Sequence, residues 1–202
     1  MTVKSNETHK ATEHKNQFIA MFSVNDPVVY PGHGVAKINR IVEKTVGREV
    51  VHFFELKFLH KEMTVLVPTT NLSSVGIRPL SSTSHITHVF KLLAQPSKEV
   101  SPYELTASNW NKRNKEYQMK IRKGDLLELS EIYRDLKTIA RQKELSFGEK
   151  SLLQQTEMLL AEEISIVEKV GEDTILSLLR SPFNKVVPRP LLSYGTEKVR
   201  TL

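Results

Sequence analysis

The apolar residues of this chain change their spacing near residue 80, and this change constrains the fold more than any single motif. Between residues 22 and 78, Val, Ile, Phe and Thr stand in short runs separated by Gly, Pro and Asn. Such runs are typical of the strands of a small, strongly bent sheet or barrel. After residue 84 the apolar positions recur every three or four residues, which is the period of an amphipathic helix.

This division predicts two domains of the α+β class within the 202 residues. We expect a small SH3-like or Tudor-like β-barrel of five short strands over residues 20–80 and a compact helical bundle over 85–180. The flanking segments differ from both. Residues 1–19 are polar and predict a disordered tail, and 181–202 begin with closely spaced prolines and predict a flexible or docked tail.

Local signals place the individual elements. Strand-forming runs occur at 27–30, 35–42, 50–58 and 64–68, with a tight turn at Pro31-Gly-His-Gly34 and a hairpin at Gly47. Helical periods and caps predict helices at 85–94, from Ser108 or Asn109 to Arg122, from Asp125 to Ile139, from Ser146 to Val167 and at 173–179. Ser146-Phe-Gly-Glu149 has the capping-box pattern. Tyr133 lies on an apolar stripe, so we expect it in the core.

Several functions are excluded by what the sequence lacks. It contains no cysteine, which excludes a disulfide scaffold and any Cys-ligated zinc site. It also has no Gly-rich phosphate loop, no Gly-x-Gly-x-x-Gly after a strand, no His-Glu-x-x-His pair and no Gly-x-Ser-x-Gly elbow. We therefore expect no enzymatic activity and no cofactor.

The remaining titratable groups have simple interpretations. His85 and His88 stand three residues apart, but such a pair without nearby carboxylates is more often coincidental than metal-binding. No nucleophile stands near His33, so a packing role in its turn is favoured over general-base catalysis. The adjacent acids Glu162 and Glu163 are interpreted as a solvated helix face. We expect no metal site.

Neither a membrane span nor a leader is predicted. No run approaches the roughly 18–20 apolar residues that a membrane-spanning helix needs. The segment 1–17 is polar and lacks the apolar stretch of a signal peptide. We therefore expect a cytoplasmic protein without membrane contact.

The net charge of +6 is concentrated in one cluster. Between Trp110 and Lys123 a single acid, Glu116, faces a set of basic residues: Lys112, Arg113, Lys115, Lys120, Arg122 and Lys123. A cationic cluster beside an aromatic ring could follow a phosphate backbone and offer a wedge to the bases. From charge alone, an ordinary solvated helix face is the commoner explanation.

Short motifs in a fixed order over residues 21–180 carry a specific resemblance. The first half contains Phe22-Ser-Val-Asn-Asp-Pro-Val-Val-Tyr-Pro-Gly-His-Gly-Val-Ala36, Met63-Thr-Val-Leu-Val-Pro68 and Val75-Gly-Ile-Arg78. The second half contains Asn109-Trp-Asn-Lys-Arg113, Lys123-Gly-Asp125, Tyr133-Arg-Asp-Leu136 and Leu145-Ser-Phe-Gly-Glu-Lys150. With both halves matched in order, the chain resembles the CarD family of bacterial transcription regulators.

The resemblance implies a non-enzymatic factor with two macromolecular partners. The N-terminal module would dock on the β subunit of bacterial RNA polymerase. The helical domain would bind promoter DNA in the minor groove, at the upstream edge of the melted region. Together these contacts would stabilise the open promoter complex, and the protein would be associated with the nucleoid.

The resemblance also suggests DNA-binding residues. Trp110 would wedge into the minor groove at a distorted base step. Lys112, Arg113 and Lys115 would reach the flanking phosphates. Lys150, beside the capping box, would add an anion site built from its ammonium and the helix amides. The alternative for Trp110 is a core or interdomain anchor, since large aromatic side chains are usually buried.

Two positions are expected at the polymerase interface. Lys44 matches an exposed basic residue of the family's sheet. A second basic position of the family is occupied here by Leu66, which suggests a more apolar contact. The alternative for Leu66 is a core-facing strand residue, although Val65 and Val67 alternate against it.

Other functions are open from the sequence. A nucleoid-type general DNA-binding protein, with a barrel used for self-association, would not depend on polymerase. The polymerase-binding module of a transcription–repair coupling translocase shares the barrel, but that enzyme needs helicase motifs and none are present. The oligomeric state is not assigned, and an exposed barrel edge would allow a domain-swapped dimer.

Overall fold

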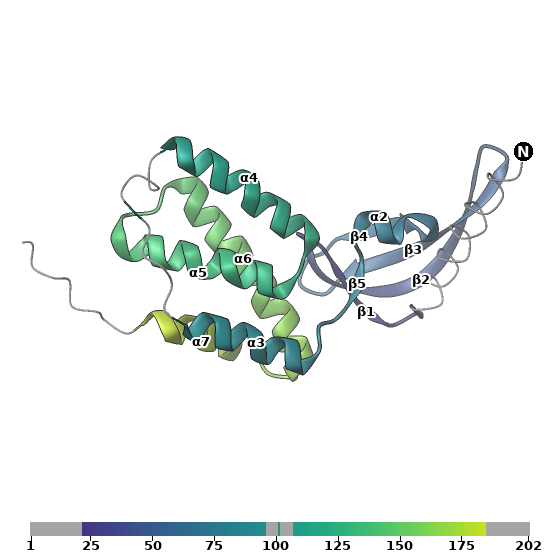
Figure 1. The fold of residues 1–202 in the computed structure, drawn as a ribbon. Coiled ribbons are helices and arrows are strands. Elements are labelled where there is room, and N and C mark those ends of the chain that lie inside the picture. Colours follow the sequence, from purple (N-terminus) through teal and green to yellow (C-terminus); the bar gives the residue numbers. More distant parts are fainter. Residues whose placement is uncertain (1–21, 96–100, 102–106, 185–202) are drawn as a thin grey trace, which may run out of the picture.

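Figure 1 shows the computed structural model, which describes residues 22–95, 101 and 107–184. Its first half is one antiparallel sheet of five strands in the order β4-β3-β2-β1-β5. The strands are β1 (Pro27–Tyr30), β2 (Gly34–Val46), β3 (Glu49–Phe58), β4 (Thr64–Pro68) and β5 (Arg78–Pro79). These agree with the predicted strands, with β2 extended to the hairpin turn.

The predicted α+β class with a small N-terminal sheet domain is confirmed, and the sheet is open. Closure would require the outermost strands β4 and β5 to pair, whereas β4 pairs with β3 and β5 pairs with β1. The physical reason lies in β5. It is two residues long and ends in Pro79, which has no N–H to offer a further strand.

The long β2–β3 hairpin extends beyond the rest of the sheet (Figure 1). A two-residue turn, Gly47-Arg48, joins the paired residues Val46 and Glu49, and Gly47 has the positive φ of 67° that such a turn requires. A bulge at Asn39 changes the register between Ile38 and Arg40. The predicted hairpin at Gly47 is therefore confirmed.

One face of the sheet carries a small core. Its centre is formed by Ile38, Phe54, Leu56 and Val67, all at most 3 % exposed. The segment after β4, comprising η1 (Thr69–Asn71) and α2 (Leu72–Val75), adds the buried Leu72 to this core. This core stays separate from that of the helical domain.

The second half is helical, as predicted. It contains α3 (Thr83–Ala94), α4 (Ala107–Lys123), α5 (Leu126–Gln142), α6 (Phe147–Glu168), α7 (Glu172–Arg180) and η2 (Ser181–Phe183). Helix α5 is central and packs against α3, α4 and α6, with Tyr133 fully buried. The capping box of Ser146 and Glu149 is present, and Asp125 caps α5 by accepting bonds from the amides of Leu127 and Glu128.

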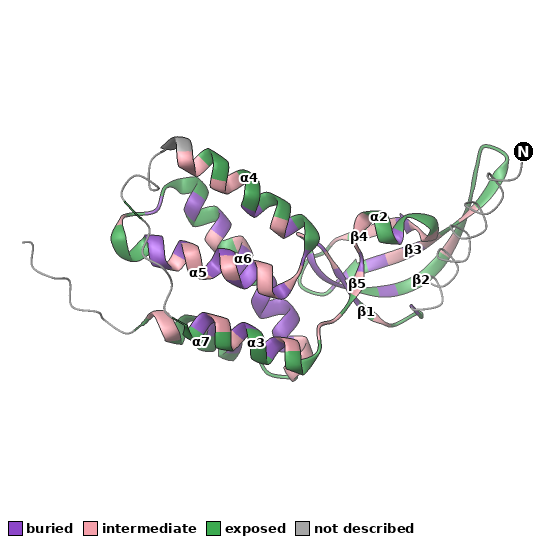
Figure 2. Cartoon of the chain, viewed as in Figure 1, coloured by how far each residue is buried: buried purple, intermediate pink, exposed green. Residues whose placement is uncertain are grey.

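The expectation of a solvated face at Glu162 and Glu163 is wrong. Glu162 is 6 % exposed and Glu163 is 2 % exposed. Figure 2 shows why: the half of α6 nearest the sheet is buried, because it runs beneath the junction of the two domains. These carboxylates face the sheet domain instead of water.

The end of the described chain docks onto the helices. Phe183, in η2, meets the ring of Tyr133 edge-on at 5.6 Å, and the Arg141 guanidinium lies 5.4 Å from the centre of the Phe183 ring. The tail predicted over 181–202 therefore starts with an ordered turn. Residues 185–202 and 1–21 lie outside the described residues, so their predicted disorder stays a prediction. None of the described helices is long and apolar enough to cross a membrane.

Candidate functional surfaces

Trp110 lies in the first turns of α4 and is half-buried. Its indole packs against the helical core and against the start of α6, so closely that a Cβ added to Gly148 would lie 3.3 Å from Trp110 Cζ2. The residue as a whole is partly exposed. This packing agrees with the alternative of a core anchor, and DNA contact by Trp110 stays a prediction.

Arg113 follows one turn later on the same side of α4 and points inward. Its side chain is 17 % exposed, and Nη2 lies 3.6 Å from Oε1 of Glu149, a carboxylate that is 1 % exposed. Burial opposes the ionisation of Glu149. Hydrogen bonds from Lys143 and Ser146 outweigh this and hold its pKa below the usual range. Arg113 therefore faces a buried negative charge, which leaves it badly placed for a phosphate.

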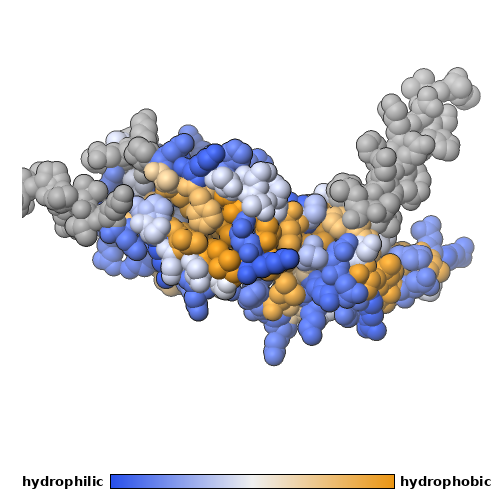
Figure 3. Space-filling view, turned by 90° about the horizontal axis from the view of Figure 1, so that it is seen from below, coloured by the Kyte–Doolittle hydropathy of each residue, from blue (hydrophilic) through white to orange (hydrophobic). Residues whose placement is uncertain are grey.

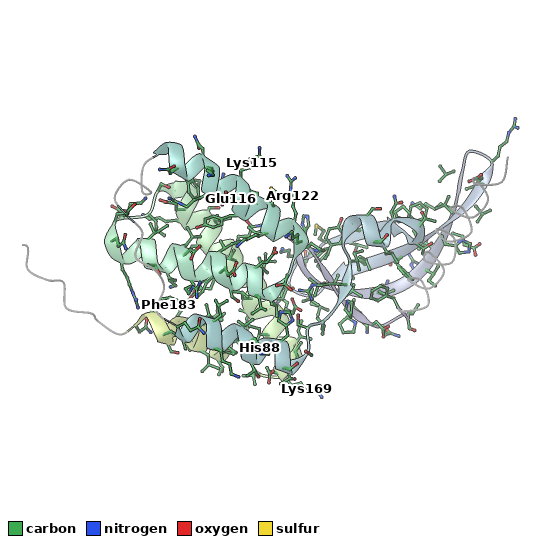
Figure 4. All side chains as sticks on the ribbon, viewed as in Figure 1. His88, Lys115, Glu116, Arg122, Lys169 and Phe183 are labelled. Atoms are coloured by element: carbon green, nitrogen blue, oxygen red, sulfur yellow. The ribbon has the colours of Figure 1, made fainter. Side chains whose placement is uncertain are left out.

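Lys112 and Lys115 lie on the opposite, outward side of α4. A helix of about 3.6 residues per turn places them in one row with Met119 and Arg122, a row that we call the outer stripe. All four side chains are exposed, and Figure 4 shows Lys115 and Arg122 projecting away from the other helices. Among the described residues, no carboxylate forms an ion pair with Lys112, Lys115 or Arg122.

The other cations of α4 are neutralised by the neighbouring helix. Lys120 bonds Glu131 at 2.5 Å and Lys123 bonds Glu128 at 2.9 Å, both acids being on α5. The basic cluster of the sequence is therefore divided in three parts: Arg113 inward, Lys120 and Lys123 toward α5, and the outer stripe toward solvent. Only the last has uncompensated charge for a polyanion.

Lys150, expected at an anion site, has partners of its own in the structure. Its backbone N–H donates to the carbonyl of Ser146 at 2.9 Å, which continues the helix ladder and removes the amide as an anion donor. Its ammonium donates to the exposed Glu144 at 2.8 Å. A role of Lys150 in DNA binding stays a prediction.

Phe147 is a surface residue that the sequence reasoning missed. It is the first residue of α6 and is 89 % exposed. It adjoins Gly148, against which Trp110 packs, so the two rings lie at one end of the helical domain, which we call the aromatic end. A large apolar residue inside a capping box, outside the apolar stripe of its helix, is the signal that could have identified it.

Lys44 and Leu66 share one face of the sheet. Directly paired residues in antiparallel strands point to the same side of the sheet. Lys44 pairs with Val51, and Leu66 pairs with Glu55. Val51 and Glu55 are four residues apart on β3, so they too point to the same side. Their separation along β3 is about 13 Å. The alternative that Leu66 faces the core is wrong, since Val67 and the partly buried Val65 are the β4 residues that join it.

This outer sheet face, defined by Arg40, Val42, Lys44, Val46, Val51, Phe53, Glu55 and Leu66, mixes apolar and charged groups. Val46 is 58 % exposed. Arg40 donates to Glu55 at 2.9 Å, and these hydrogen bonds, with one from Asn39, lower the pKa of the Glu55 carboxyl. Figure 3 shows further apolar surface on the projecting hairpin, where Ile41 and Val50 are also exposed.

The histidines have local partners. His85 lies 3.7 Å from Asp125, and His88 Nδ1 lies 2.9 Å from the carbonyl of Ser84. His33 packs edge-on against Tyr30 at 5.0 Å, in keeping with a packing role in the turn. In the described ranges no group of three or more His, Cys, Asp or Glu side chains could hold a metal ion.

The chain thus has two domains: an open antiparallel sheet with an exposed mixed face, and a helical domain with a cationic stripe and an aromatic end. Residues 22–81 match the family model of the CarD-like/TRCF RID domain, and residues 88–180 match that of the CarD C-terminal domain. The chain is 31 % identical over 160 residues to "Putative transcription factor YdeB" of Bacillus subtilis (strain 168). That alignment covers 78 % of this chain and 99 % of the relative.

The chain therefore belongs to the CarD family, and the resemblance seen in its motifs is confirmed. Both domains of that family are present in order, which gives the chain the organisation of a transcription regulator.

Proposed function

We propose that this protein binds the β subunit of RNA polymerase through its sheet domain and promoter DNA through its helical domain, and so stabilises the open promoter complex. The observation that carries the proposal is the presence of two exposed surfaces of different chemistry on two domains in contact. The outer sheet face mixes apolar and charged groups. The helical domain offers unpaired cations beside an aromatic end.

The outer sheet face suits a protein partner. Exposed apolar side chains beside a few charges are typical of the surfaces that become buried in protein–protein interfaces. Lys44 supplies a cation, and Leu66 and Val46 supply apolar area on the same face. The description of the matching family model, a RID domain shared with TRCF, supports polymerase as that partner.

The helical domain suits a distorted DNA duplex. The Trp110 ring, anchored on Gly148, and the exposed Phe147 could insert at an unstacked base step in the minor groove. Lys112 and Lys115, on the outward side of the same helix, could contact the phosphates at the groove edge and fix the register. None of these groups reads base identity, so promoter preference would come from DNA deformability and from polymerase.

Few phosphates are available to this surface. Among the described residues, three outer-stripe cations are without a carboxylate partner, which supports a weak and salt-sensitive affinity for free DNA. A nucleoid-type protein that holds duplex tightly without polymerase would need more uncompensated charge. We therefore favour a protein that acts on DNA together with polymerase over a nucleoid-type protein. It would act in the cytoplasm, at the nucleoid.

Capture of polymerase tests the first half of the proposal. The full-length protein should retain the purified β subunit in the absence of DNA, and Leu66→Asp should weaken this retention by about tenfold or more, since it places a charge in an apolar contact. Leu59→Asp is the matched control, because Leu59 is 46 % exposed and lies beyond the end of β3. Equal retention by both variants, or retention of duplex DNA without polymerase at physiological salt, would count against the proposal.

A further inference from the structure

The junction of the two domains is formed by adjacent acidic residues on α6 that reach different parts of the sheet domain. Glu163 receives two hydrogen bonds from Arg78, each of 2.7 Å, and one from the backbone N–H of Ser81 at 2.9 Å. Arg78 belongs to β5 and also donates to the carbonyl of Gly124, at the turn between α4 and α5. One arginine thus links the sheet to two helices.

Glu162 contacts a second point of the sheet domain, the turn between β1 and β2. Val35 of this turn and Arg78 of β5 pair with opposite sides of Val29, so the two contact points are about 10 Å apart. A Cβ added to Gly34 would lie 2.0 Å from Glu162 Oε2, so the carboxylate occupies the space that any side chain at this position would need. The backbone N–H of Val35 bonds the same carboxylate. Gly34 has a φ of +108°, which also favours glycine there.

Smaller contacts surround these two. In the β1–β2 turn, Pro31 packs so closely on Gly124 that a Cβ added there would lie 3.0 Å from Pro31 Cβ. His60, in the loop after β3, lies 3.2 Å from Glu172 at the start of α7. A cavity of only about 10 Å³ remains at the junction, so the two domains are in tight contact.

The geometry restricts rotation between the domains. A single ion pair would leave the domains free to turn about it, but Glu162 and Glu163 hold two separate points of the sheet domain. The connection from β5 to α3 is short, running from Pro79 to Thr83. In some proteins a buried ion pair adds little to net stability and is retained because it favours one unique arrangement of the parts that it joins.

We infer that Glu162 and Glu163 form an interdomain clamp that fixes the orientation of the outer sheet face relative to the aromatic end. This inference rests on the proposed function, because the clamp would hold a polymerase-docking face and a DNA-contacting end at one separation. The two glutamates and Arg78 are positioning residues. They contact neither partner, and their effect is on the joint engagement of both.

The distance between the domains tests the clamp directly. Since the chain has no cysteine, Lys57→Cys on β3 and Glu116→Cys on α4 give two unique spin-label sites, both exposed. The otherwise unmodified protein should give one narrow distance distribution, and Glu162→Gln/Glu163→Gln should broaden it. Glu157→Gln is the matched control: it removes a half-buried carboxylate of α6, one bonded to Tyr133 and Arg180 within the helical domain. It should leave the distribution narrow.

Open-complex lifetime provides the functional readout. The double variant should bind the polymerase β subunit and free duplex as the wild type does, yet lose most of the lifetime extension at a promoter. If circular dichroism shows that the double variant is unfolded, Arg78→Lys replaces it in both measurements. This substitution keeps the positive charge but loses the bidentate hydrogen bonds to Glu163.

An unchanged distance distribution in the folded clamp variants would overturn the inference. So would a broadened distribution with an unchanged lifetime. A wild-type protein that fails to extend the lifetime would contradict the proposed function instead, and the spin-label distances would then decide the clamp by themselves.

Discussion

At the scale of single residues, two glycines show how backbone requirements and close packing combine. Gly47 and Gly124 have nearly the same positive φ, 67° and 69°. A Cβ at Gly47 would meet nothing within 4 Å, whereas one at Gly124 would lie 3.0 Å from Pro31 Cβ. The comparison separates the cost of the left-handed backbone from the cost of a clash at the domain junction.

Gly124→Ala should lower the free energy of unfolding more than Gly47→Ala does. Both variants place a side chain in the left-handed region, at a cost of about 1–2 kcal/mol. Only Gly124→Ala also displaces Pro31, so we expect it to cost at least about 1 kcal/mol more. Urea unfolding monitored by Trp110 fluorescence measures both, and equal costs would show that the junction yields easily.

Glu157 gives a prediction for pH. Burial opposes its ionisation most, but hydrogen bonds from Arg180 and Tyr133, with the nearby Lys137 charge, together hold its pKa below the usual range. The folded protein thus binds fewer protons at this site than the unfolded chain does, so the site's stabilisation is present above about pH 4.5 and is lost as the pH falls further.

Glu157→Gln should therefore destabilise the protein by about 1–3 kcal/mol at pH 7. The difference from the wild type should shrink toward pH 3, where the wild-type carboxyl becomes protonated. Urea midpoints at several pH values measure this. A difference that stays constant with pH would mean that the carboxylate charge contributes nothing.

At the scale of elements, the sequence predicts the features that depend on local periodicity. It does not predict those that depend on packing between elements distant in the sequence. The strands, the helices and the capping box of Ser146 follow from local patterns and are present. The burial of Glu162 and Glu163 was missed because the sheet domain covers α6, and no local pattern reveals that contact. The open edge of the sheet was not predicted either, since it depends on the short length of β5 and on Pro79.

Helix α4 shows the same limit for the candidate site. The sequence groups Lys112, Arg113 and Lys115 with Trp110, but helical geometry puts Arg113 with Trp110 on the inward side and both lysines on the outward side. The outward position of Lys115 could have been predicted from spacing alone. The pairing of Lys120 with Glu131 could not, because it depends on how α4 packs on α5.

The outer stripe gives a salt-dependence prediction. Lys115→Gln should reduce the slope of log affinity for duplex DNA against log salt concentration by about 0.9, the loss of one phosphate contact. Lys169→Gln is the matched control: Figure 4 shows Lys169 on the opposite side of the helical domain, and none of the described acids pairs with it. Equal effects of the two substitutions would mean that the stripe is not the DNA surface.

At the scale of the whole molecule, two domains with separate cores are held in one arrangement by buried charges. Each surface alone offers a modest interface. A protein that binds two sites of one assembly gains affinity from a fixed geometry, because the second contact is then made within the same complex. The net charge of +6 therefore describes this chain poorly. Several charges of the described residues pair within the helical domain or across the domain junction, and the outer stripe is without a carboxylate partner among them.

The most direct test is the lifetime of open promoter complexes formed by RNA polymerase with the wild type, Trp110→Ala or Phe147→Ala. We expect the wild type to extend the lifetime and each variant to shorten it by roughly tenfold, the loss of about 1–3 kcal/mol of ring–base contact. Both variants should still bind the polymerase β subunit. Met158→Ala, which removes another exposed apolar side chain elsewhere on α6, should behave as the wild type. An unchanged lifetime in folded, polymerase-bound Trp110→Ala and Phe147→Ala would contradict a DNA-contacting role for the aromatic end.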